Sequence, residues 1–106
     1  MQEQNWTQTE KKVARQVFDT ALQAELSELL LAFKQRAAAA ATPDDMWAIA
    51  ELLLDQRREI ECKYDFRCSQ LLFVFGRLVR EKRVRVEDLQ QLSDDKLSVI
   101  QRIASL

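Results

Sequence analysis

The chain has 106 residues, enough for one domain, with 16 basic and 17 acidic side chains and a formal net charge of −1. It contains no histidine, the commonest general base and metal ligand, and its two cysteines match no zinc motif. A single glycine rules out a glycine-rich phosphate loop. These absences argue against an enzyme and against a metal or cofactor site, and the near-neutral charge argues against a nucleic-acid-binding protein.

The apolar segments are too short to cross a membrane. The longest runs, residues 29–33 and 71–75, fall far short of the roughly 20 residues that a membrane-spanning helix needs. The opening residues MQEQNW are polar, and no apolar core of the kind found in secretory signals follows them. We therefore expect a soluble cytoplasmic protein with a single all-helical domain over residues 1–106.

Residues that break helices are scarce, so the sequence predicts long helices. The pattern TQTE at residues 7–10 is a capping box, which predicts that the first helix begins there. The alanines at 37–41 favour its continuation. Between them lies one apolar stripe at helical spacing, formed by Phe18, Leu22, Leu26, Leu29 and Phe33.

The only strong break is TPDD at residues 42–45, where Thr42 can cap a helix and Pro43 suits its first position. A second helix should begin here and run to about Lys82, with Gly76 inside it at a cost of about 1 kcal/mol. Its apolar stripe would contain Met46, Ile49, Leu53, Ile60, Tyr64, Leu71, Phe75 and Leu78.

The end of the chain predicts two shorter elements. Residues 84–89 indicate a short helical turn, and residues 93–106 indicate a last helix that Ser93 caps. No stretch has the pattern of a strand in a sheet. The predicted fold is therefore all-α, an extended helical protein with two long helices and short C-terminal helices.

The length of the second helix predicts a homodimer. About 40 residues of helix would extend about 60 Å, whereas a compact chain of this size has a radius of gyration of about 13 Å. The remaining residues cannot cover the apolar stripe along such a length. We therefore expect a second copy to cover it, with Met46 and Leu53 in the dimer seam. The alternative is a monomeric helical hairpin with a frayed end.

Arg57 occupies a position within this apolar stripe. A buried unpaired charge is strongly unfavourable, so the guanidinium must reach water, a carboxylate or a partner. Glu61 lies four residues further along, and Glu51 and Glu59 could approach from either copy. The sequence thus indicates an interface or partner site at Arg57, and the alternative is that the side chain extends to solvent.

Residues 44–81 and 84–106 resemble the cyanobacterial fluorescence recovery protein family. The most specific part is KYDFR at residues 63–67, which QRREI precedes and LLFVFGRL follows. A looser likeness continues through Trp6 and residues 17–30. The resemblance therefore covers nearly the whole chain.

The resemblance implies a non-enzymatic homodimer, without a cofactor, that acts on the orange carotenoid protein. It would bind the photoactivated red form, chiefly at its C-terminal domain, and accelerate the return to the orange form. It would also help to detach that protein from the phycobilisome and so end non-photochemical quenching. The stretch 57–85, with nine basic and four acidic residues, leaves open a peripheral association with the phycobilisome or the cytoplasmic side of the thylakoid membrane.

Four residues match positions that the family uses at its dimer interface or partner-binding surface: Trp47, Glu51, Arg57 and Phe73. Glu51 stands where the family has aspartate. Two other positions depart from the family's pattern, since Ala50 replaces a histidine and Val99 replaces a lysine that helps to contact the partner. The alternative hypothesis is therefore a diverged relative with the same dimer scaffold and a different protein partner.

Overall fold

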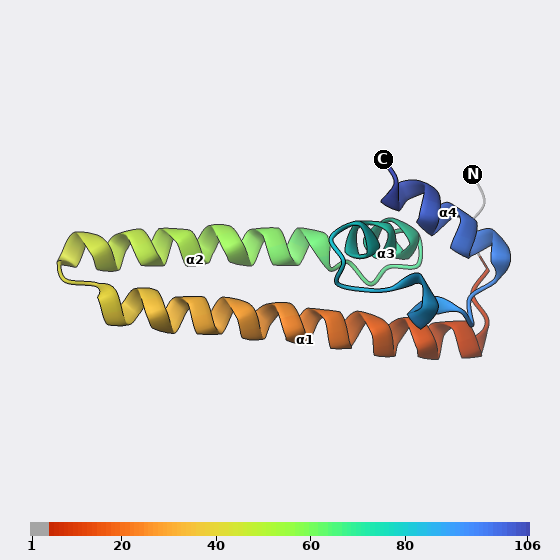
Figure 1. Ribbon diagram of the computed structural model, residues 1–106, viewed down its shortest axis with the longest axis horizontal. Helices are drawn as coiled ribbons and strands as arrows, with labels where there is room; N and C mark the ends of the chain where they lie inside the picture. The colour runs from red at the N-terminus through yellow and green to blue at the C-terminus, as the bar shows by residue number, and fades with distance from the viewer. Residues whose placement is uncertain (1–4) are drawn as a thin grey trace. The chain divides into compact units, whose positions relative to one another are not determined.

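The computed structural model describes residues 5–106, which form helices and connecting segments with no strand among them. The four α-helices, labelled in Figure 1, are α1 (Gln8–Ala39), α2 (Pro43–Lys63), α3 (Leu71–Arg80) and α4 (Asp94–Ala104). The short 3-10 helix η1 (Val86–Leu89) comes between α3 and α4 in the sequence. This confirms the predicted all-α fold.

The described chain divides into two compact units. Unit 1 contains the residues up to Leu22 and those from Tyr64 onward, and unit 2 contains residues 23–63. The first part of α1 therefore belongs to unit 1 and the rest of that helix to unit 2. A single domain over residues 1–106 stays a prediction, and residues 1–4 lie outside the described part.

The predicted caps start the helices. At α1, the Glu10 backbone N–H donates to Thr7 Oγ1 (3.0 Å) while Glu10 Oε1 accepts from the Thr7 backbone N–H (3.0 Å). At α2, the Asp45 backbone N–H donates to Thr42 Oγ1 (3.1 Å) while Asp45 Oδ2 accepts from the Thr42 backbone N–H (3.2 Å). At α4, Ser93 Oγ accepts from the Lys96 backbone N–H (3.3 Å). Short polar patterns thus located all three starts correctly.

The predicted length of the second helix is wrong. Instead of running to about Lys82, α2 ends at Lys63, and a new helix, α3, begins at Leu71. The predicted apolar stripe is divided accordingly. Its members up to Ile60 belong to unit 2, while Tyr64 and the three that follow it are buried in unit 1.

Side-chain contacts explain the break at residues 64–70. Tyr64 and Phe66 both meet the Phe18 ring edge-on, with ring centres 5.4 Å and 4.8 Å apart. Asp65 accepts from the backbone N–H of Arg67 (3.1 Å), a local bond that competes with helix formation. Packing on α1 and this turn therefore prevail over a sequence that is otherwise compatible with helix.

The core of unit 1 forms where α3 and α4 pack together. Its largest fully buried side chains are Phe75, Leu71, Leu78, Leu89 and Ile100. The two helices come very close at Gly76, where an added Cβ would lie 2.4 Å from Ile103 Cγ2. A glycine is therefore required here for space, and not only tolerated within a helix as the sequence indicated.

A buried ion pair also belongs to unit 1. Lys96 Nζ lies 3.2 Å from Glu10 Oε1, and each side chain is only 6% exposed. Burial raises the pKa of Glu10, but hydrogen bonds from the backbone N–H groups of Thr7 and Ser93 and from Lys96 outweigh it. The pKa of Glu10 in the folded chain therefore lies below its ordinary value of 4.5.

The substitution Gly76→Ala should destabilise the protein by about 1–3 kcal/mol, because α4 would have to move away from α3. At an unobstructed helical position the same change would stabilise by about 1 kcal/mol, so the sign of the change in the free energy of unfolding distinguishes the two cases. Urea unfolding measures it. Shortening Ile103 to alanine should not restore stability, because its Cβ would still lie 2.6 Å away. A more stable Gly76→Ala variant would contradict the close packing.

Acid should weaken the stability that Glu10 contributes. Because its folded pKa is lowered, this contribution is complete above the ordinary value of 4.5 and is lost as the pH falls through the folded pKa. Thermal unfolding between neutral pH and about pH 3 should therefore show a smaller loss of stability in Glu10→Gln than in the wild type. Equal losses in the two proteins would show that Glu10 has no such role.

Candidate functional site

Unit 2 has almost no buried side chains of its own. Among residues 23–63, all of them described, only Lys63 is buried. Large apolar side chains are exposed instead, namely Leu26, Leu30, Leu31, Met46, Trp47 and Leu54. A concentration of exposed apolar side chains usually marks an interaction surface. The candidate site of the protein therefore lies on this unit.

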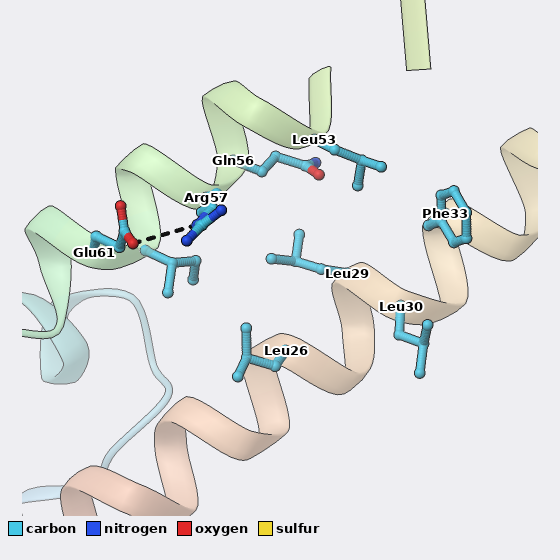
Figure 2. A pocket seen from close by; sticks show the side chains of 9 residues that line it. Leu26, Leu29, Leu30, Phe33, Leu53, Gln56, Arg57 and Glu61 are labelled. Carbon is cyan, nitrogen blue, oxygen red and sulfur yellow. Dashed lines mark hydrogen bonds and ion pairs between the residues drawn. The ribbon is translucent and has the colours of Figure 1, made fainter. Parts of the chain in front are cut away.

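The centre of the candidate site is an apolar groove of about 470 Å³ within unit 2. Figure 2 shows Leu29 of α1 and Leu53 of α2 extending from facing helices into it. The groove is lined by Leu26, Leu29, Leu30, Phe33, Leu53, Gln56, Arg57, Ile60 and Glu61. Members of both predicted stripes thus share one surface.

Arg57 lies at the polar edge of this groove (Figure 2). Its Nε is 3.4 Å from Glu61 Oε2, and the arginine side chain is 75% exposed. The structure therefore shows an ion pair with Glu61, one of the carboxylates expected near Arg57, together with the access to solvent that was the alternative to an interface site. Such an exposed pair stabilises a fold by about 1 kcal/mol or less, so the fold does not depend on Arg57.

The other predicted site residues have distinct positions. Trp47, at the start of α2, is 61% exposed, and Met46 and Glu51 on the same helix are exposed too. Leu53 is partly covered in the groove. Phe73 belongs to unit 1, where it is 58% exposed on α3. The groove thus brings Leu53 and Arg57 together, whereas Met46, Trp47, Glu51 and Phe73 do not line it.

Sequence reasoning missed Leu54. It lies seven residues after Trp47 and therefore on the same side of α2, about two helical turns away. Ala50 lies between them and leaves little side-chain bulk there. The spacing of Trp47 and Leu54 can be read from the sequence. The exposure of Leu54 cannot, because it depends on which other side chains pack around it.

The residues that join the two helical segments of unit 2 were also missed. Lys63 Nζ lies 2.8 Å from Glu25 Oε1, and the lysine side chain is 4% exposed. This buried pair connects the last residue of α2 to α1. Its partners are 38 residues apart in sequence, and no local pattern connects them.

Within residues 5–106, no group of three or more histidine, cysteine, aspartate or glutamate side chains could hold a metal ion. Helix caps and ion pairs account for two lowered carboxylate pKa values. Backbone N–H groups of Ala41 and Thr42 lower the pKa of Asp45, and Arg67 lowers the pKa of Asp65.

In the part of the chain that is described, no helix has the length and apolar character to span a membrane.

Comparisons with known proteins agree with the resemblance. Residues 6–104 match the family model described as photoprotection regulator fluorescence recovery protein. The fluorescence recovery protein of Synechocystis sp. PCC 6803 is 39% identical over 95% of this chain and 93% of its own length.

Two solved structures have the same fold. The fluorescence recovery protein of Fremyella diplosiphon is 29% identical, with a TM-score of 0.90, over 96% of this chain and all of that one. The Synechocystis sp. PCC 6803 structure is 38% identical, with the same TM-score and the same coverage. The likeness therefore extends over both units.

Proposed function

The chain belongs to the fluorescence recovery protein family of photoprotection regulators, and from this premise we propose that it acts on the orange carotenoid protein. It binds the photoactivated red form, chiefly at the C-terminal domain, and accelerates its return to the orange form. It thereby helps to detach the carotenoid protein from the phycobilisome and ends non-photochemical quenching. The match over residues 6–104 is the observation that carries this proposal.

The exposed apolar surface supports a role exercised through binding alone. The regulator binds the partner most tightly at an intermediate stage, when its separated domains begin to re-associate. Such differential binding lowers the barrier to recovery without making or breaking a covalent bond. The protein is therefore not an enzyme. It acts in the cytoplasm, where the carotenoid protein binds the phycobilisome.

A second copy of the chain covers the apolar groove of unit 2. In a two-fold symmetric pair the same face of each chain meets the other, so one groove supplies both sides of the interface. Leu53 and Met46 lie in the seam. Trp47, Glu51 and Arg57 on α2 and Phe73 on α3 serve the dimer interface or the surface that meets the carotenoid protein.

The two departures from the family's pattern define the second candidate. Ala50 and Val99 are both partly buried and small, and neither offers the charge or hydrogen bonds of the residue it replaces. If those groups are essential for recognition, the protein is a diverged relative whose dimer binds another protein. Recovery of the carotenoid protein at the unassisted rate would favour this second candidate.

Arg57→Leu should reduce the acceleration of recovery at least about tenfold, because a charged side chain at the groove would be lost. The matched control is Arg58→Leu, which removes an exposed arginine that does not line the groove. Absorbance follows red-to-orange recovery in darkness, and far-UV circular dichroism should show unchanged helix content in both variants. Full activity of a folded Arg57→Leu variant would refute this role.

Leu53→Glu should convert the dimer into monomers, because a carboxylate in the apolar seam would be desolvated without a partner. Ala24→Glu is the control, since Ala24 is exposed on α1 and does not line the groove. Light scattering coupled to size-exclusion chromatography measures the masses. A Leu53→Glu protein that stays dimeric would place the seam elsewhere.

A further inference from the structure

One carboxylate connects the starts of two helices in unit 1. Glu10 Oε1 accepts from the Thr7 backbone N–H, which completes the capping box of α1. Its second oxygen, Oε2, accepts from the backbone N–H of Ser93 over 2.8 Å, and Ser93 is the N-cap of α4. The start of α4 is therefore bonded to the start of α1, although 83 residues separate Glu10 from Ser93.

Lys96 strengthens this connection. Its ammonium lies 3.2 Å from Glu10 Oε1, donates to the backbone carbonyl of Asn5 and is 5.0 Å from the centre of the Trp6 ring. These contacts all come from residues 5–10. Together with Glu10, Lys96 forms a buried charged cluster, which we call the α4 latch.

The chemistry of the α4 latch favours specificity over stability. A buried ion pair often stabilises a protein no more than apolar residues of similar volume would, although removing one partner alone is strongly destabilising. Apolar contacts, such as those of Ile100, are non-directional. The bonds of Glu10 to Ser93 and Lys96 have narrow geometric limits, so they are satisfied in one placement of α4.

The placement of α4 affects the surface that contains Phe73. Helix α4 crosses α3 at Gly76, where there is no room for a Cβ beside Ile103. Phe73 precedes Gly76 by three residues, and residues at this spacing are neighbours on a helix surface. Phe73 is nevertheless 58% exposed, so it lies beside the crossing point and not beneath it. A displacement of α4 would therefore change the surface around Phe73.

We propose that Glu10 and Lys96 are positioning residues that hold α4 in the one placement that shapes the Phe73 surface for the carotenoid protein. This rests on the proposed function, in which Phe73 serves partner binding. The latch acts through α4 and does not itself touch the partner. Its loss should therefore weaken partner binding more than it weakens folding.

The test uses the double variant Glu10→Gln/Lys96→Met, which removes both charges and leaves no uncompensated buried ion. The matched control is Lys12→Met/Asp95→Asn, which removes one exposed charge from each of the same two helices and leaves the net charge unchanged. The single variant Lys96→Met shows the effect of leaving Glu10 unpaired. All are compared with the wild-type chain.

Three measurements separate positioning from folding. Amide hydrogen exchange in α4 should accelerate about 100-fold in Lys96→Met, and the double variant should recover most of this protection. Fluorine NMR of fluorophenylalanine-labelled protein should show a shifted or broadened Phe73 signal in the double variant, with Phe73→Leu identifying the signal. The double variant should also need about tenfold more protein for half-maximal acceleration of recovery. The control should match the wild type in all three.

A double variant with the wild-type Phe73 signal and the wild-type half-maximal concentration would overturn the proposal. If the wild-type chain itself does not accelerate recovery, the proposed function fails. The fluorine signal then still decides whether the latch shapes the Phe73 surface, and an unchanged signal in the double variant would refute it.

Discussion

Two helical segments that lie side by side cannot bury the apolar residues on all of their faces, and unit 2 consists of two such segments and their connection. Its exposed leucines, methionine and tryptophan and its apolar groove follow from this constraint. Unit 1 instead has a core, in which residues of α3, α4, η1 and the first part of α1 are buried, although Phe73 on α3 stays exposed. The protein thus combines a unit that has its own core with a unit whose large apolar side chains are mostly exposed.

The parts of the fold that local chemistry determines were predictable from the sequence. Thr7, Thr42 and Ser93 each start a helix through a side chain that bonds a backbone group three residues away. The end of α2 was not predictable in this way, because residues 64–70 leave the helix to pack on Phe18, far away in the sequence. Tertiary contacts here prevail over a helix-compatible sequence.

The candidate site was predictable to a similar extent. Most of its apolar lining and the anomaly of Arg57 were visible in the helical spacing, and Glu61 was one of three candidate partners for Arg57. The ion pairs Lys63–Glu25 and Lys96–Glu10 were not, since each joins segments with no shared local pattern. Sequence periodicity shows which face of a helix is apolar, but not whether another part of the chain covers it.

The central claim is that a second copy of the chain covers the groove of unit 2. Sedimentation equilibrium of the wild-type protein over a wide range of concentrations tests this most directly. The account predicts a species of twice the chain mass of 12.4 kDa that stays associated at low micromolar concentration. A fully helical protein that sediments at 12.4 kDa over the whole range would contradict it.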